Sequence, residues 1–176
     1  MSCRNRFAFG VVLLVGASCN SSPTIEGQSV ELASLAFEVP VGWQRQDTKQ
    51  RGVTTSMWVP EDNTSKESIT VIRTDHASAI ANGGYGGLEK TLRRAQAALP
   101  DARISASRSL TTSRGLAGAR IEVDYVPPGL TERYQRVHVV LVDGSTLVHV
   151  LYTTKSATAQ QAALGLVLDT IRHEEA

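Results

Sequence analysis

Three runs of alternating apolar and polar residues most limit how this chain can fold. They cover Leu116–Val126, Tyr134–Val142 and Ser145–Thr154. A period of two places successive side chains on opposite faces of a β-strand, so each run predicts a strand with one buried face. Asp143-Gly144 joins the last two runs, and Asp-Gly between alternating runs is a strong signal for a tight hairpin. The second half of the chain therefore predicts an antiparallel sheet.

The same periodicities predict the remaining elements. Four more strands are expected, at Leu35–Val39, Val53–Val59, Ser68–Thr74 and Ala102–Leu110. Two amphipathic helices are expected, one over Leu88–Leu99, which ends at Pro100, and one over Ala159–Arg172. Both helices must bury their apolar stripes on the sheet. The predicted fold class is α+β, an antiparallel β-sheet of about six to seven strands flanked by two main amphipathic helices.

The N-terminal residues have the pattern of an export signal. A short segment with Arg4 and Arg6 precedes the apolar run Phe7–Val15, and Gly16-Ala17-Ser18 leads to Cys19. This order of a basic, an apolar and a small-residue region is typical of a signal peptide, and it resembles a bacterial lipoprotein signal in which Cys19 receives the lipid. An ordinary secretory signal with a chance cysteine, or an uncleaved anchor, would also fit. The lipoprotein interpretation predicts an exported protein held at the membrane of the bacterial envelope by lipid on Cys19.

Composition limits the partners of the predicted mature protein. We expect a signal peptide over residues 1–18, a lipidated Cys19 and flexible tether over 19–33, and one domain over 34–174. The chain has 18 Lys and Arg and 17 Asp and Glu; without Arg4 and Arg6, 16 basic residues face 17 acidic ones, a net charge of −1. This near-neutral balance gives no support for nucleic-acid binding or for electrostatic docking on acidic lipid. No cysteine follows Cys19, so no disulfide and no cysteine-based metal site is expected.

Several short segments together resemble a known family. Phe37-Glu38-Val39-Pro40-Val41-Gly42-Trp43 opens the domain, Gly118-Ala119-Arg120-Ile121-Glu122-Val123 follows the first helix, and a hairpin around Val142-Asp143-Gly144 precedes the last helix. Their order and spacing resemble the PsbP-like superfamily, which includes bacterial DcrB-type envelope lipoproteins and relatives with domains of unknown function. The resemblance implies an antiparallel sheet flanked by helices and a non-enzymatic accessory role. It names no partner.

One group of side chains could form a binding site. With Asp143-Gly144 as the turn, Val142 pairs with Ser145, and His138 then lies directly opposite His149, with Cβ atoms about 4.5–5.5 Å apart. Glu122 and Asp124 lie on the polar face of the preceding strand, and we expect them beside this pair if the two strands are neighbours. The cluster would suit a metal or a small ligand. Alternatively, it is the wetter face of a half-covered sheet, with cross-strand ion pairs of little energy each.

A glycine-rich segment lies before the first helix and is expected to be a loop that could contact a partner protein. It consists of Gly83, Gly84, Tyr85, Gly86 and Gly87. It lacks the Gly-Lys-Ser/Thr end of a phosphate-binding loop.

The sequence therefore leaves two functions open. No hydrolase or metalloprotease motif is present, and no cofactor and no enzymatic activity are expected. The first function is that of an envelope lipoprotein that binds or assembles an envelope protein partner without catalysis. The alternative is a lipoprotein that binds a metal or small ligand through the His138–His149 pair.

Overall fold

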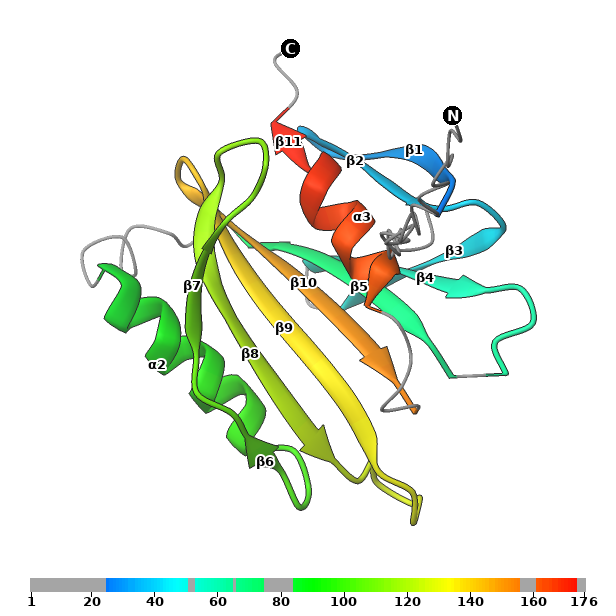
Figure 1. Ribbon diagram of the computed structural model, residues 1–176, viewed down its shortest axis with the longest axis vertical. Helices are drawn as coiled ribbons and strands as arrows, with labels where there is room; N and C mark the ends of the chain where they lie inside the picture. Colours follow the sequence, from blue (N-terminus) through cyan, green and yellow to red (C-terminus); the bar gives the residue numbers. More distant parts are fainter. Residues whose placement is uncertain (1–24, 51–52, 65, 75–83, 156–160, 174–176) are drawn as a thin grey trace, which may run out of the picture.

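The computed structural model describes residues 25–50, 53–64, 66–74, 84–155 and 161–173 (Figure 1). The expected signal peptide and Cys19 lie outside these residues. Within the described part, no helix has the length and apolar character needed to cross a membrane.

The largest unit of the described fold is an eight-stranded antiparallel sheet. Its strand order is β3-β4-β5-β10-β9-β8-β6, and β7 also pairs with β8. The strands are β3 (Trp43–Gln50), β4 (Val53–Pro60), β5 (Ser68–Thr74), β6 (Arg103–Ile104), β7 (Arg108–Thr111), β8 (Ala117–Tyr125), β9 (Tyr134–Asp143) and β10 (Thr146–Thr154). The predicted alternation in the second half thus corresponds to the three consecutive strands β8, β9 and β10.

A smaller sheet joins the two ends of the domain. It has the order β1-β2-β11, with β1 (Gly27–Leu32), β2 (Leu35–Pro40) and β11 (Arg172–His173). Helix α3 (Ala162–Thr170) packs against β2. Because β11 follows α3 directly and pairs with β2, the C-terminal segment is fixed to the N-terminal hairpin.

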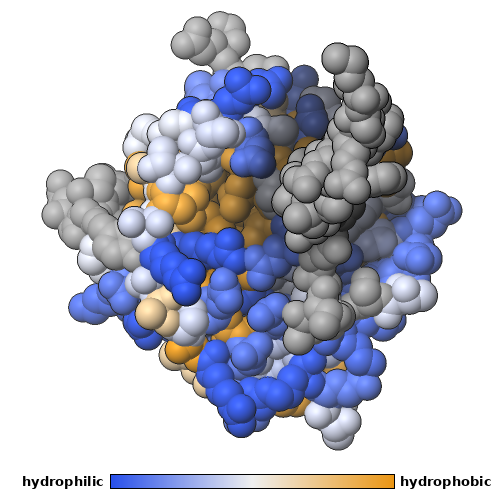
Figure 2. Space-filling view, in the orientation of Figure 1, coloured by the Kyte–Doolittle hydropathy of each residue, from blue (hydrophilic) through white to orange (hydrophobic). Residues whose placement is uncertain are grey.

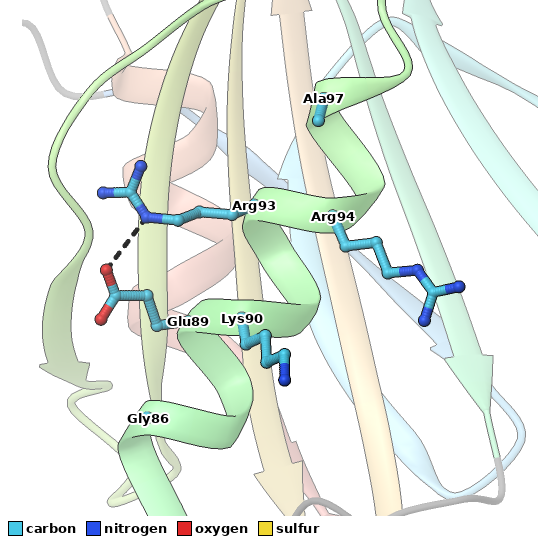
Figure 3. Close-up of a pocket in the computed structure, with 6 residues that line it drawn as sticks. All are labelled: Gly86, Glu89, Lys90, Arg93, Arg94 and Ala97. Carbon is cyan, nitrogen blue, oxygen red and sulfur yellow. Dashed lines mark hydrogen bonds and ion pairs between the residues drawn. The ribbon is translucent and has the colours of Figure 1, made fainter.

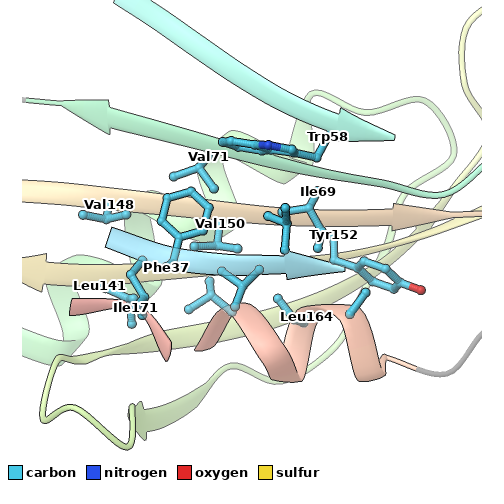
Figure 4. Packing of buried hydrophobic residues seen from close by; sticks show 14 of the residues in the cluster. Phe37, Trp58, Ile69, Val71, Leu141, Val148, Val150, Tyr152, Leu164 and Ile171 are labelled. Carbon is cyan, nitrogen blue, oxygen red and sulfur yellow. The ribbon is translucent and has the colours of Figure 1, made fainter. Parts of the chain in front are cut away.

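The main hydrophobic core lies between one face of the large sheet and the layer formed by β2 and α3. Figure 4 shows Phe37 of β2 between Trp58 of β4 and α3, with Tyr152 and Leu164 nearby. All four of these side chains are buried, and their residues come from four different elements. The apolar stripe of α3 therefore packs with β2 on the apolar face of the large sheet, as the sequence pattern predicts.

Helix α2 (Gly84–Ala97) covers the opposite face of the large sheet and contacts β8, β6 and β9. Leu88 and Leu92 of α2 pack on Ile121 and Val123 of β8 and on Val140 of β9, which form a second hydrophobic cluster. The predicted α+β class with helices flanking an antiparallel sheet is confirmed. Figure 2 shows hydrophobic residues in patches on the visible face, with hydrophilic residues between and around them.

The structure differs from the expected element boundaries at four places. The last helix, α3, ends at Thr170, and Arg172, the expected end of that helix, belongs to strand β11. A strand, β1, occupies Gly27–Leu32, so the tether expected through residue 33 is wrong for this part. Strand β3 at Trp43–Gln50 was not expected, and the strand expected at Ala102–Leu110 is divided into the short β6 and β7. β1 and β3 are rich in polar residues and lie at sheet edges, where burial imposes no alternation.

The glycine-rich segment is also different from the expectation. Gly84 to Gly87 form the first turn of α2 and are not a loop, while Gly83 lies outside the described residues. Glycine in a helix costs only about 1 kcal/mol relative to alanine. Burial of Leu88 and Leu92 beneath the next turns offsets that cost.

Candidate functional site

The two histidines singled out from the sequence lie together, but not in the expected register. Asp143 pairs with Thr146, so the turn residues are Gly144 and Ser145. His138 therefore lies opposite Leu151 and His149 opposite Val140, and the expected direct pairing is wrong by two residues. A shift of two keeps each side chain on its face, because the side-chain period of a strand is two. The imidazoles are consequently diagonal neighbours on one face of the sheet.

The rings contact each other and a glutamine of α2. His138 Nε2 and His149 Nδ1 are 3.1 Å apart, and the ring centroids are 5.3 Å apart with an interplanar angle of 38°. On the other side of His138, the Nε2 atom of Gln96 lies 2.8 Å from Nδ1. The amide N–H of Gln96 donates to His138 Nδ1, so the proton of His138 is on Nε2 and is donated to His149 Nδ1. The three side chains form one directed hydrogen-bond chain.

This chain is embedded in apolar surroundings. His138 is 4% exposed and Gln96 3% exposed, and they belong to the small set of buried polar residues. Burial, followed by the neighbouring His149 and the positive charge of Arg136, lowers the pKa of His138 to about 3. Burial also lowers the pKa of His149. Both rings are therefore neutral at pH 7, in agreement with the hydrogen-bond directions.

The two acidic residues expected beside the histidines lie on the other face of the sheet. Ile121 of β8 pairs with His138 of β9, whereas Glu122 pairs with Val137 and Asp124 with Gln135. Directly paired residues share a face. Glu122 and Asp124 therefore share the face of the main core, where Glu122 accepts a hydrogen bond from Arg120 at 2.9 Å. The prediction that the acids and histidines form one cluster is wrong. The register of β8 on β9 pairs His138 with Ile121, and this places Glu122 on the opposite face of the sheet from His138.

The geometry does not favour a metal at the histidine pair. In the described part of the chain, no three His, Cys, Asp or Glu side chains are close enough to hold a metal ion. The Nδ1 lone pair of His138 accepts from Gln96 and that of His149 accepts from His138. Coordination through these atoms would require breaking both hydrogen bonds.

Gln96 was not singled out from the sequence, because glutamine is usually found on the solvent side of an amphipathic helix. Its spacing of four from Leu92 and eight from Leu88 puts it on the buried side, and this spacing is the signal that identifies it. The Oε1 atom of Gln96 is buried without a hydrogen-bond partner. Gln96 is thus a buried polar link between α2 and strand β9 of the sheet.

The outer side of α2 carries a different feature. A hollow of about 590 Å³ lies against it, and the described residues that line it are Gly86, Glu89, Lys90, Arg93, Arg94 and Ala97. Figure 3 shows Arg93 bonded to Glu89 on one side of the helix and Lys90 and Arg94 directed to the other side. Of the glycine-rich segment, Gly86 lines this hollow. All its charged groups are at the solvent surface, so they are the ordinary polar face of an amphipathic helix.

Strand β3 forms one edge of the large sheet and pairs with β4 alone. At its start, Gln28 donates to the carbonyl of Trp43 at 2.9 Å. Arg45 donates to Asp47 at 2.8 Å, and its guanidinium lies 5.5 Å from the centre of the Trp58 ring. From Gln46 to Lys49 no described segment pairs with the outer edge of β3.

Comparison with known proteins gives a fold and no closer relationship. Neither a protein-family model nor a curated protein matches the sequence. LpqN of Mycobacterium tuberculosis, described as involved in cell envelope biogenesis, is 12% identical with a TM-score of 0.60, over 87% of this chain and 93% of LpqN.

Two further solved structures have the same arrangement. The cyanobacterial PsbP of Synechocystis sp. PCC 6803 is 18% identical with a TM-score of 0.53, over 79% of this chain and 86% of its own. A protein of Bacteroides thetaiotaomicron is 8% identical with a TM-score of 0.56, over 87% of this chain and 50% of its own. At these identities the likeness concerns the fold. The resemblance inferred from the short sequence segments is confirmed at that level: the chain has the PsbP-like fold.

Proposed function

We propose that this protein is a lipid-anchored accessory module of the bacterial cell envelope that binds a protein partner without catalysis. The observation that carries the proposal is the likeness to LpqN, which spans 87% of this chain and 93% of LpqN with a TM-score of 0.60. LpqN is described as involved in cell envelope biogenesis, and the signal-like residues before Cys19 agree with an envelope location. The lack of a metal-ligating cluster among the described residues is compatible with a binding role.

The outer edge of β3 is the proposed contact surface. An unpaired strand edge presents backbone N–H and C=O groups that can pair with a strand of another protein. Arg45, Asp47 and Lys49 lie along this edge and are exposed. Charged residues on an edge strand prevent indiscriminate pairing, so a partner strand must carry compatible charges. This gives the edge selectivity.

Site-specific photo-crosslinking in intact cells tests the proposal. A photoreactive amino acid replaces Gln46 or Thr48 in the full-length protein, and Leu130, an exposed residue of a distant loop, is replaced as the matched control. We expect one dominant envelope protein to be crosslinked from β3 and not from position 130. The same crosslinks from all three positions would contradict the use of β3, and no crosslinked envelope protein from any surface position would contradict the binding function.

A further inference from the structure

Two features of α2 weaken its attachment to the sheet. The first is the composition of its N-terminal turn, in which three of the four residues are glycine: Gly84, Gly86 and Gly87. Each such residue is about 1 kcal/mol less favourable than alanine in a helix, and the first turn holds no acidic residue that would interact with the helix dipole. The helix therefore depends on its contacts with the sheet.

The second feature is the polar contact beneath its C-terminal half. Gln96 donates to His138 at 2.8 Å, and His138 contacts His149 at 3.1 Å. This chain of hydrogen bonds forms only while both rings are neutral, because a protonated His138 would present an N–H to the donating amide of Gln96. Protonation of His149 would add an N–H at Nδ1, so that two N–H groups, this one and the N–H at His138 Nε2, would face each other between the rings.

Among the residues that the structure describes, the groups that face the pair offer no negative charge to balance a proton. On β8 the facing residues are apolar or tyrosine: Ala119, Ile121, Val123 and Tyr125. On β10 and β5 the neighbours on this face are Leu147, Leu151, Thr153, Thr70, Ile72 and Thr74. On α2 the inward residues are Leu88, Leu92 and Gln96. The one charged side chain among the described residues of this face is Arg136 of β9, which lies 4.8 Å from the centre of the Tyr125 ring.

We propose that the His138–His149 pair is an acid-sensitive latch, which holds α2 on the sheet at neutral pH and releases it when the surroundings become acidic. Release uncovers the apolar cluster beneath α2, formed by Ile121, Val123 and Val140 with Leu147. In the released form the rings are hydrated and titrate near pH 6.5. Protonation then favours release, since only the released form accepts the protons readily.

The size of the effect follows from proton linkage. With an open-state pKa of about 6.5 and a closed state that stays neutral, lowering the pH from 7 to 5 raises the opening equilibrium constant about 25-fold for His138 alone. The depressed pKa of His149 adds to this in the same direction. The latch thus responds across the range of pH 5 to 7.

Hydrogen exchange of the α2 amides at pH 7 and pH 5, corrected for intrinsic exchange rates, tests the latch. In the wild-type protein we expect opening of α2 to increase at least 25-fold, while the amides of β5 and β10 stay protected. The double variant His138→Gln/His149→Gln should show less than a threefold change. Leu92→Ala is the matched control: it loosens α2 at both pH values and keeps the pH dependence.

Two results would overturn the latch. One is an α2 opening in the wild type that does not change with pH, and the other is an equal pH dependence in the double variant. If the double variant does not fold, nitrogen NMR of the histidine rings in the wild type decides. Rings that become protonated while the α2 amides remain protected would exclude the mechanism, and rings that become protonated only together with α2 exchange support it.

Discussion

Phe37 and Trp58 pack edge to face between the small sheet and the large one, with ring centroids 5.3 Å apart and an interplanar angle of 81°. Phe37 comes from β2 and Trp58 from β4, and both are buried. Edge-to-face packing brings the positive edge of one ring to the negative face of the other, which adds about 0.5–1.5 kcal/mol to the burial of the two rings. This contact joins the two sheets across the main core.

Replacing Phe37 by Ala should destabilise the domain strongly. Loss of a buried phenylalanine costs about 3–5 kcal/mol through lost apolar burial and the remaining cavity. Denaturant unfolding followed by tryptophan fluorescence measures the difference. Phe37→Leu keeps most of the volume and should cost less than half as much. Equal losses in the two variants would mean that the aromatic contact matters more than the volume.

The stability of the domain should fall between pH 7 and pH 5. The folded-state pKa of His138 is about 3, below the unfolded value of about 6.5. The unfolded chain therefore takes up protons first as the pH falls. The contribution of the neutral His138 to the free energy of unfolding is fully present above pH 6.5 and is lost progressively toward pH 3. By pH 5 the free energy of unfolding has fallen by about 2 kcal/mol from His138 alone. Urea unfolding at both pH values measures it.

His138→Gln should remove most of this pH dependence. Val139→Ala, on the same strand with its side chain in the main core, is the control. It destabilises the domain through a small cavity at both pH values and leaves the difference between them unchanged. An unaltered difference in His138→Gln would show that other groups cause the acid sensitivity.

The fold could be predicted from the sequence where burial imposes a pattern. Strands β8 and β10 alternate because one face is buried more deeply than the other, whereas the centre of β9, Val137–Leu141, is buried on both faces. The hairpin between β9 and β10 carries its glycine. The glycine did not define the register, because Gly144, with φ of +56°, is the first of the two turn residues and not the second. A turn with glycine in either position is acceptable, and only the structure distinguishes them.

The candidate site was predictable only in part, for a related reason. His138 and His149 lie on one face for either turn, so their proximity followed from the sequence. The position of Glu122 depended on the register of β8 on β9, and no tight turn joins these strands. A slip of one residue moves every side chain of a strand to the other face. In the observed register Glu122 and Asp124 lie on the face of the sheet opposite to the histidines.

Two glycines provide a matched test of backbone packing. An added Cβ at Gly118 of β8 would lie 2.1 Å from the carbonyl oxygen of Val140 on β9, whereas one at Gly86 of α2 meets nothing within 4 Å. Gly118→Ala must therefore push β9 away and should cost about 1–3 kcal/mol. Gly86→Ala removes a glycine from the helix and should stabilise the domain by about 0.5–1 kcal/mol. Thermal unfolding of the two variants should shift in opposite directions, and a shared direction would contradict this assignment of packing.

Membrane attachment should depend on a single cysteine. Under the proposed function, Cys19 carries the lipid, and two or more acyl chains anchor a protein stably where one chain binds only marginally. Cys19→Ser should move the protein from the membrane fraction to the soluble fraction, because under that function the lipid on Cys19 is what attaches the protein to the membrane. Cys3→Ser, which changes the only other cysteine of the chain, is the control and should leave the protein in the membrane fraction. Fractionation combined with metabolic labelling by a fatty acid measures both properties. Retention of an unlabelled Cys19→Ser protein in the membrane would favour an uncleaved N-terminal anchor, and an unlabelled wild-type protein in the soluble fraction would favour ordinary secretion.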